Sequence, residues 1–283
     1  MRVDVVIPAF GRPALLNEAI ESVLRQTYSD LSLFVVDDGS PHPIAPQVGF
    51  SDPRLKLLRL EKNGGSGPAR NYGVAAGTSP LIAFLDSDDL WQPQKLEHQV
   101  RYLQEHHECQ WLHCNELWLR SGVEVKQRAE HRKQGGRFLE RAFGRCLIAT
   151  SAVLLRRGFF ERHGGFARPF RVCQDYELWL RLLADAPVGF LEDALAIKRT
   201  GDWLQASATP EIDRFRVLAL HRFYRQIRRD ATAQAYIGPL LSEAERKSRM
   251  LVAGAEKHGN RRRLGVYHAW FTLFKALRTR LMR

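Results

Sequence analysis

The sequence predicts an α/β fold with a mainly parallel central sheet flanked by helices and a helical extension at the C-terminal end. Three observations support this prediction. Short apolar runs alternate with amphipathic segments over residues 1–90, which is the pattern of a parallel sheet with flanking helices. Acidic or glycine-rich turns follow several of these runs. After Pro210 the strand patterns vanish, and the remaining apolar residues have helical spacing.

The elements follow in order. The predicted strands of the first half are residues 3–7, 33–36, 55–58 and 81–85. Pro8 ends the first strand, and Pro13 suits the first turn of a helix. A glycine-rich loop at residues 63–67 precedes a second helix, which we expect to begin at Pro68. The second half predicts helices from Pro93 and over 176–183, and strands at 111–119, 152–155 and 188–191. We place a domain boundary near residue 208.

The composition is that of a globular protein. A chain of 283 residues with 45% hydrophobic and 26% charged residues can bury a full core. No apolar run is long enough to predict a spanning helix, and the N-terminus lacks the pattern of a signal peptide. The four cysteines are too few for a disulfide framework at this length. We therefore expect a cytoplasmic protein.

The net charge of +12 is concentrated at the C-terminal end. Residues 261–283 contain seven Arg or Lys and no acid, so this segment carries most of the excess positive charge. An apolar stripe with helical spacing crosses the same segment: Tyr267, Trp270, Phe274, Leu277 and Leu281. Two interpretations stay open. The helix lies on an anionic membrane surface, which would make the protein peripheral at the inner face of the membrane, or it docks on its own domain.

The acidic cluster after the fourth strand is the strongest candidate site. Asp86, Asp88 and Asp89 fall within four positions, directly after apolar residues 81–85. Open α/β sheets bind ligands at the carboxyl ends of their strands. Clustered carboxylates there favour a hard divalent cation that holds a diphosphate, because the cation offsets their repulsion. The alternative is the start of a helix, with Asp89 as its cap.

Three further residues are candidates for the same chemistry, each with a structural alternative. Asp38 follows the second strand and either accepts a hydrogen bond from a base or ribose, or forms a plain Asp-Gly turn. Arg70 follows the glycine-rich loop and either contacts a diphosphate or locks the acidic loops. Asp175 stands at a predicted helix start, where it is a helix cap or a general base.

A group of histidines and cysteines at residues 106–114 lacks the spacing of a zinc module. We expect its cysteines, Cys109 and Cys114, to be small core residues. His113, Glu116 and Trp118 either face an acceptor or pack.

Five motifs, taken in order, resemble glycosyltransferase family 2. They are residues 6–10 (Val-Ile-Pro-Ala-Phe), 36–40 (Val-Asp-Asp-Gly-Ser), 69–71 (Ala-Arg-Asn), 86–88 (Asp-Ser-Asp) and 174–181 (Gln-Asp-Tyr-Glu-Leu-Trp-Leu-Arg). The resemblance implies a GT-A nucleotide-sugar transferase domain over residues 1–207, followed by a helical extension at 208–283 with a basic amphipathic end. The Gln-x-x-Arg-Trp motif of processive polysaccharide synthases is absent, so we expect transfer of one sugar per encounter.

The resemblance also implies a role for each matching position. Asp88 would ligate Mg²⁺ or Mn²⁺, Asp86 would face the ribose or the metal, and Asp175 would be the catalytic base. In relatives a histidine precedes a Gln-x-Ser segment; here Asp202 takes its place ahead of Gln205 and Ser207 and is a candidate third metal ligand. The remaining nucleotide-sugar contacts would come from Pro8, Ala9, Phe10, Arg12, Asp38, Arg70 and Ser87.

The predicted function is therefore inverting transfer of one sugar from a nucleotide diphosphate sugar, expected to be UDP-linked. The acceptor would be a hydroxyl of a carbohydrate or lipid-linked molecule in cell-surface polysaccharide or glycolipid assembly, with no nucleic acid as partner. One alternative is a nucleotidyltransferase, which would release pyrophosphate. The other is a basic module that binds nucleic acid or a membrane surface, which explains the tail but not the acidic strand ends.

Overall fold

The computed structural model describes residues 1–203, 205 and 208–281, and the chain divides into two compact units. Unit 1 comprises Met1–Arg137, Leu147–Arg171 and Asp185–Leu204. Unit 2 comprises Phe138–Cys146, Val172–Ala184 and Gln205–Arg283. The C-terminal helices thus share their unit with two short segments that precede residue 207. The sequence does not signal this grouping, because it depends on packing between distant segments.

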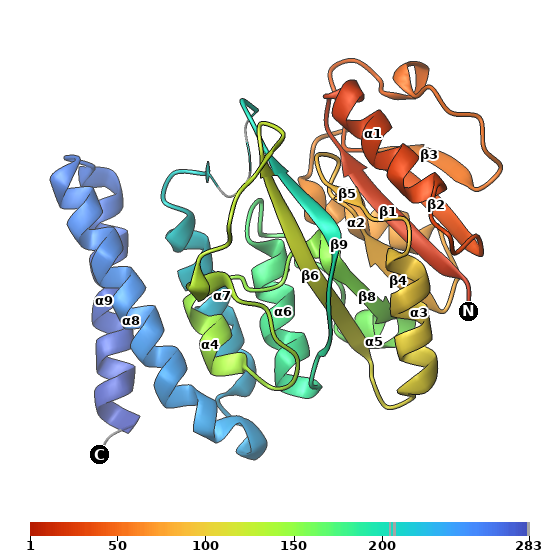
Figure 1. Cartoon of the computed structure of the whole chain (residues 1–283). Helices are drawn as coiled ribbons and strands as arrows, with labels where there is room; N and C mark the ends of the chain where they lie inside the picture. Colours follow the sequence, from red (N-terminus) through yellow and green to blue (C-terminus); the bar gives the residue numbers. More distant parts are fainter. Residues whose placement is uncertain (204, 206–207, 282–283) are drawn as a thin grey trace. The chain divides into compact units, whose positions relative to one another are not determined.

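Unit 1 is built on one sheet in the order β3-β2-β1-β4-β8-β6-β9-β5, with β7 paired to β6 (Figure 1). The first four strands run parallel, as predicted: β1 (Val3–Ala9), β2 (Leu31–Asp37), β3 (Leu55–Arg59) and β4 (Leu81–Phe84). Beyond β4 the sheet is mixed. Antiparallel pairs join β8 (Val153–Arg156) to β4 and β6, β5 (Leu90–Trp91) to β9, and β7 (Val123–Glu124) to β6, whereas β6 (Trp111–Arg120) and β9 (Gly189–Thr200) are parallel.

Helices cover both faces of the parallel strands. Residues of α1 (Pro13–Leu24) and α3 (Lys95–Glu105) share one buried cluster with Val5 and Leu33. The alternate residues Val6 and Val36 point to the opposite face, where α2 (Ser66–Ala75) lies. In the described part of unit 1 there is one further α-helix, α5 (Arg157–Arg162), and single 3₁₀ turns occur at Ala45–Gln47, Ala129–His131 and Thr150–Ala152.

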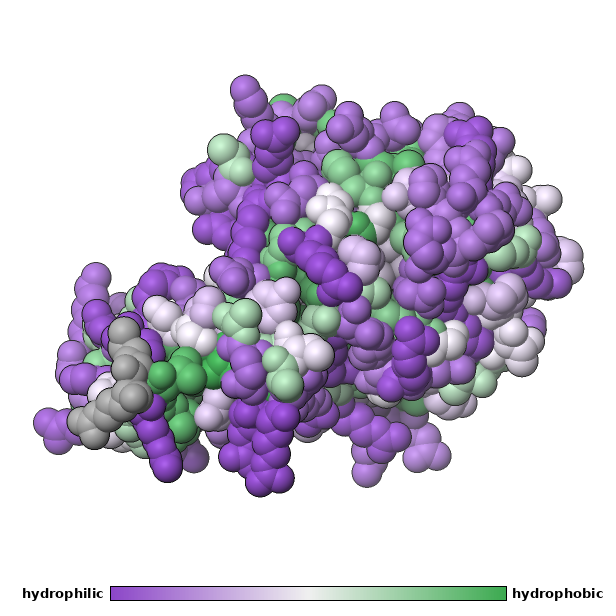
Figure 2. Space-filling view, turned by 90° about the horizontal axis from the view of Figure 1, so that it is seen from below, coloured by the Kyte–Doolittle hydropathy of each residue, from purple (hydrophilic) through white to green (hydrophobic). Residues whose placement is uncertain are grey.

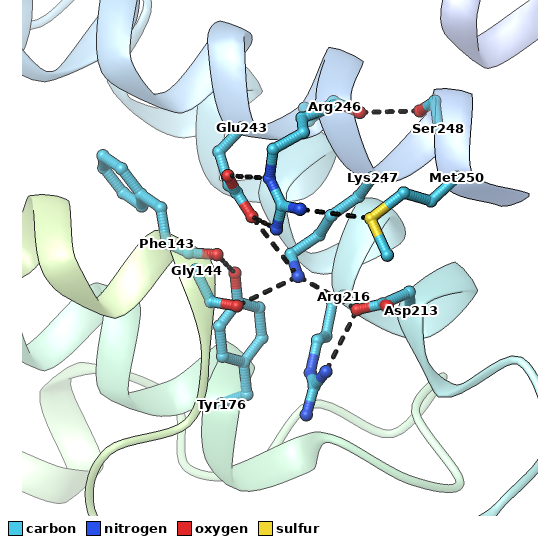
Figure 3. Close-up of polar contacts among 11 residues, drawn as sticks. Phe143, Gly144, Tyr176, Asp213, Arg216, Glu243, Arg246, Lys247, Ser248 and Met250 are labelled. Carbon is cyan, nitrogen blue, oxygen red and sulfur yellow. Dashed lines mark hydrogen bonds and ion pairs between the residues drawn. The ribbon is translucent and has the colours of Figure 1, made fainter. Parts of the chain in front are cut away.

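The described residues of unit 2 form five α-helices and a 3₁₀ turn at Ala231–Ala233. The helices are α4 (Leu139–Gly144), α6 (Gln174–Asp185, whose last residue belongs to unit 1), α7 (Ile212–Ile227), α8 (Gln234–Lys257) and α9 (Arg261–Leu281). The buried Lys247 of α8 joins several of them (Figure 3). Its ammonium donates to the Gly144 carbonyl at 3.0 Å and pairs with Asp213 at 2.9 Å. Tyr176 of α6 donates to the Phe143 carbonyl at 2.7 Å. Lys247 and Tyr176 thus each bind a backbone carbonyl in the last two residues of α4.

The apolar stripe predicted in residues 261–283 is in part an internal contact face. Tyr267 is 2% exposed and Phe274 is fully buried. On the same side of α9, Arg278 pairs with Glu245 of α8 at 2.8 Å. This stripe therefore follows the second interpretation, a helix docked on its own unit, and its central residues are not available to a membrane. Among the described residues, no helix combines the length and apolarity that crossing a membrane requires.

The contact between α2 and the sheet generates a prediction. A Cβ on Gly73 would lie 2.4 Å from Val6 Cγ1 and 3.1 Å from Val36 Cγ2. We expect Gly73→Ala to lower the free energy of unfolding by about 1–3 kcal/mol, because the added methyl overpacks this contact. Urea denaturation of the purified protein measures the change. The control is Gly254→Ala in α8, where a Cβ meets nothing within 4 Å. Equal effects of the two substitutions would contradict the packing described.

Candidate functional site

The carboxyl ends of β1 and β2 bring two of the predicted motifs together in unit 1. The strands are parallel and in register, with Ala9 opposite Asp37. Beyond them, the amide of Asp38 donates to the Ala9 carbonyl at 2.8 Å, and the amide of Gly11 donates to Ser40 Oγ at 2.9 Å. The loops after both strands are therefore tied side by side at one edge of the sheet, as the sequence predicted.

The first of these loops presents two side chains to solvent. Pro8 and Ala9 belong to β1 and are buried, so they shape the strand end rather than a surface. Phe10 is 46% exposed, which leaves its ring free to stack on a planar ligand. Gly11 and Arg12 both have positive φ values, 63° and 54°, and turn the chain into α1. Of the predicted residues in this loop, Phe10 and Arg12 are the ones a ligand can reach.

Asp38 anchors the glycine-rich loop. Its Oδ1 accepts from the amide of Gly64 at 2.9 Å and its Oδ2 from the amide of Gly65 at 2.8 Å. Burial raises the pKa of this carboxyl above its usual range, and the two amides act in the opposite direction. The close approach of the loops also requires Gly39, because a Cβ there would lie 2.7 Å from the Asn63 amide nitrogen. Asp38 thus positions the loop that leads into α2.

Arg70 holds Asp86 at the end of β4. The Arg70 guanidinium is buried, forms an ion pair with the Asp86 carboxylate and donates to Ser66 Oγ at 3.2 Å. The ring of Phe166 lies 5.1 Å from its central carbon. Asp86 keeps 35% of its side chain exposed, whereas Ser87 beside it is buried. Of the two roles expected for Arg70, locking the acidic loop is the one these contacts show.

The acidic cluster is a turn between strands and not the start of a helix. The Asp89 amide donates to the Asp86 carbonyl at 3.0 Å, β5 follows, and α3 begins only at Lys95. The alternative interpretation, in which Asp89 caps a following helix, is therefore wrong. Its buried carboxylate instead accepts from Ser151 Oγ at 2.7 Å and from the Arg199 amide at 3.0 Å. Burial, together with the charges of its acidic neighbours, raises the pKa of Asp89 to about 7.

Asp88 is held by side chains from two loops. Its carboxylate pairs with Arg12 at 3.2 Å and accepts from the indole nitrogen of Trp203 at 2.9 Å. Trp203 folds over Gly201, where a Cβ would meet the indole ring at 2.1 Å. Asp202, the predicted third metal ligand, lies exposed between these two residues. Ser207 lies outside the described residues.

Three residues that the sequence did not single out complete the acidic turn. Ser151 accepts from the Asp86 amide at 3.1 Å and donates to Asp89, which bridges both ends of the turn. Arg199 contacts the Asp88 carbonyl at 2.6 Å through Nε. Trp203 is the third. The tripeptide Gly-Asp-Trp directly after β9 is a signal that could have indicated Trp203, whereas Ser151 and Arg199 carry no such signal.

Asp175 belongs to unit 2, in the first turn of α6. Its Oδ1 accepts from the amide of the next residue, Tyr176, at 2.8 Å, and its Oδ2 lies 3.4 Å from Cys146 Sγ, which donates to it. The residue is half-buried. Cys173, just before the helix, has a φ of 61°, and burial raises the pKa of its thiol to about 12. Asp175 thus lies inside the helix, and its bonds to the Tyr176 amide and the Cys146 thiol are not those of an N-cap.

His113 and Glu116 of β6 pack rather than face an acceptor. His113 is fully buried, and its Nε2 lies 2.9 Å from the Gln134 carbonyl. Burial lowers the pKa of this imidazole to about 4. Glu116 forms a buried ion pair with Lys133 at 2.6 Å and accepts from the Trp118 indole nitrogen at 2.8 Å. These side chains stabilise β6 and the segment that covers it.

The acidic turn fits a divalent cation that arrives with a diphosphate, and not a preformed cage. In the described part of the chain, no group of three or more His, Cys, Asp or Glu side chains is placed to hold a metal. The turn offers Asp88 and the partly exposed Asp86, each paired with one arginine. Mg²⁺ is commonly bound by one or two carboxylates together with substrate phosphates. The donor set therefore suits Mg²⁺ or Mn²⁺ completed by the ligand's own oxygens.

Comparison with known protein families shows which family the chain belongs to. The family model described as "Glycosyl transferase family 2" matches residues 4–164, which include β1, β2, the glycine-rich loop and the acidic turn. The chain belongs to glycosyltransferase family 2. It is a glycosyltransferase, and this membership decides against the nucleotidyltransferase and against a binding module as its whole function.

The chain is similar in sequence to two curated proteins. The chain is 32% identical over 185 residues to the UDP-Glc:alpha-D-GlcNAc-diphosphoundecaprenol beta-1,3-glucosyltransferase WfgD of Escherichia coli, an alignment covering 65% of this chain and 70% of WfgD. It is 41% identical over 102 residues to the succinoglycan biosynthesis protein ExoW of Rhizobium meliloti, covering 34% of this chain and 32% of ExoW.

A solved structure supports the fold. The crystal structure of S. aureus TarS 1–349 in complex with UDP-GlcNAc matches 97% of this chain and 89% of its own with a TM-score of 0.67. At 16% identity this likeness speaks for the fold alone. The glycosyltransferase has a GT-A type of α/β fold, with its sheet mixed beyond β4 and helices at its C-terminal end.

The bridging role of Ser151 can be tested. We expect Ser151→Ala to lower the free energy of unfolding by about 1–3 kcal/mol, because it leaves the buried Asp89 carboxylate and the Asp86 amide each short of a partner. Guanidinium denaturation measures the loss. The control is Ser242→Ala at an exposed position of α8. A Ser151→Ala protein as stable as wild type would show that the hydroxyl does not hold the turn.

Proposed function

We propose that this glycosyltransferase moves a single sugar, with inversion, from a UDP-sugar to a hydroxyl of a carbohydrate or lipid-linked acceptor. The observation that carries the proposal is the acidic turn after β4, which Arg70 and Arg12 hold, with the exposed Phe10 two residues before Arg12 in the chain. The names of the relatives support the substrate classes. WfgD is named for a UDP-glucose donor and a diphosphoundecaprenol acceptor, and ExoW for the biosynthesis of a polysaccharide.

On this proposal the donor binds across the ends of β1, β2 and β4. The exposed ring of Phe10 stacks on the base, and Asp38 accepts a hydrogen bond from the base through a lone pair that Gly64 and Gly65 leave open. Arg12 and Arg70 lie beside the acids and supply positive charge toward the diphosphate. Pro8, Ala9 and Ser87 are buried and keep these groups in place.

Asp88 and Asp86 would hold Mg²⁺ or Mn²⁺ between the turn and the diphosphate, with the exposed Asp202 as a candidate third ligand. The bound ion would stabilise the negative charge that develops on the departing diphosphate. With the ion in this place, Arg12 and Arg70, which pair with the two carboxylates, would also lie close to the diphosphate. Ser151 and Arg199 hold the turn from the protein side, through Asp89 and the backbone.

We assign the catalytic base to Asp175. The acceptor hydroxyl loses its proton to this carboxylate while its oxygen bonds to the anomeric carbon, and the bond from that carbon to the diphosphate oxygen breaks. A single displacement of this kind inverts the configuration at the anomeric carbon. The Cys146 thiol donates to one carboxylate oxygen and orients the group, which still has lone pairs to accept the proton.

Donor binding and its metal dependence give the first test. We expect UDP-sugars to raise the melting temperature of the protein more with Mn²⁺ than without it, because a ligand that binds the folded state stabilises it by mass action. Asp88→Asn should remove the Mn²⁺-dependent part. A thermal-shift panel of UDP-, GDP- and dTDP-sugars measures this, with Glu124→Gln at an exposed site of β7 as the control. If UDP-sugars raise the melting temperature equally with and without Mn²⁺, the metal has no part in donor binding.

The base gives the second test. We expect Asp175→Asn to lower the turnover number by about 10²–10⁴-fold, because the acceptor hydroxyl loses its proton acceptor. The thermal shift caused by the UDP-sugar should stay unchanged. Release of nucleoside diphosphate measures turnover, mass spectrometry of the product counts the sugars added, and Glu140→Gln on the exposed side of α4 is the control. Wild-type turnover by Asp175→Asn would show that another group is the base.

A further inference from the structure

Helix α9 has a second apolar stripe, on a different side from the one that packs against α8. Its members are spaced alternately four and three residues apart, which places them along one side of the helix. All are exposed, Val266 by 49% and Leu273 by 38%. We call this stripe the α9 outer face; it consists of Arg262, Val266, Ala269, Leu273, Ala276 and Arg280.

The inner side of α9 packs against α8, so the position of the outer face at the surface of the unit is fixed. Tyr267 and Phe274 are buried, and Arg278 pairs with Glu245 of α8. Figure 2, which views the molecule from below, shows hydrophobic side chains at the surface beside the C-terminal end of the chain. The outer face runs for about 27 Å, since the chain rises about 1.5 Å at each of the 18 steps from Arg262 to Arg280.

The charge of α9 has one sign. Its described residues include six Arg or Lys and no Asp or Glu. Arg263 and Arg278 pair with Glu211 and Glu245 of the same unit. Within the described part of the chain, Arg261, Arg262, Lys275 and Arg280 form no ion pair with an acid. The outer face therefore combines exposed apolar side chains with uncompensated positive charge at both of its ends.

This charge pattern discriminates between the possible occupants. In a dimer through the outer face, Arg262 or Arg280 would meet an arginine of the second copy in either orientation of the helices, and α9 has no acid to offset it. An anionic lipid surface offers phosphates to both arginines and an apolar boundary to Val266 and Leu273. Charge complementarity thus favours lipid over a second copy.

We propose that the α9 outer face docks on an anionic lipid bilayer. Val266 and Leu273 enter the boundary between headgroups and acyl chains, and Arg262 and Arg280 reach the lipid phosphates on either side. The purpose of this docking rests on the proposed function, because a lipid-linked acceptor is presented at a membrane surface. The docking itself depends only on α9.

Vesicle co-sedimentation of the full chain tests the proposal. The probes are vesicles of phosphatidylcholine alone and of phosphatidylcholine with about 30% phosphatidylglycerol, at about 0.1 M and about 0.5 M NaCl. We expect binding to the anionic vesicles only, weakened at the higher salt. Leu273→Glu should reduce the apparent partition coefficient by about tenfold or more, because it places a charge at the apolar boundary.

The matched control is Thr272→Glu, which adds the same charge to the neighbouring residue on a different, exposed side of α9. We expect it to retain binding within about fivefold, the effect of one surface charge worth about 1 kcal/mol. Equal losses in the two variants would overturn the outer face as the docking surface. Absent or lipid-independent binding by the wild type, or a vesicle-free dimer that Leu273→Glu dissociates in light scattering, would overturn the bilayer as its occupant.

The thermal shift with UDP-sugar, measured on the same samples, separates this proposal from the proposed function. We expect Leu273→Glu to keep the full shift while it loses vesicle binding. A wild-type protein that binds anionic vesicles but is not stabilised by any UDP-sugar would contradict the proposed donor and leave the docking surface standing.

Discussion

Mutual repulsion among the carboxylates at the end of β4 is the constraint around which unit 1 is arranged. Asp86, Asp88 and Asp89 occupy one turn, and each is held by a different group. An arginine from α2 neutralises the first, and an arginine from the β1 loop neutralises the second. The third, Asp89, is buried, and its pKa is raised because burial disfavours the charged form of the carboxyl group. Without these partners, three acids at one strand end would not be stable as a tight turn.

The same contacts explain why the turn can accept a ligand without losing its shape. Ser151 and the backbone of Arg199 hold the buried side of the turn, through groups that a donor cannot reach. The solvent side carries Arg12 and the exposed part of Asp86, whose carboxylate the buried Arg70 holds from α2. On the proposed function, a cation and a diphosphate would exchange partners on the outer side while the inner side stays fixed. This separation suits a site that must bind and release a charged substrate in each cycle.

In α9, two sides of one basic amphipathic helix have different roles. Residues such as Tyr267 and Phe274 provide the contact that stabilises α9 on α8. The outer face, offset around the same helix, remains exposed and bears positive charge at both ends. A single apolar stripe read from the sequence could not separate these roles, because both faces contain large apolar residues at helical spacing. Exposure in the folded unit is the property that distinguishes them.

The sequence by itself determined the parallel half of the sheet, the order of the site motifs and the family, because these depend on local periodicity and on short runs of residues. Strands such as β1 and β4, the proline at the start of α1 and the acidic turn were all predictable for this reason. Only the tertiary structure decided that Asp89 is buried against Ser151, that Trp203 holds Asp88 and that the sheet is mixed beyond β4. Each of these contacts joins residues more than 60 positions apart, or strands whose direction depends on how the chain returns to the sheet. Their energy comes from burial and from paired charges, which exist only once the distant segments have met.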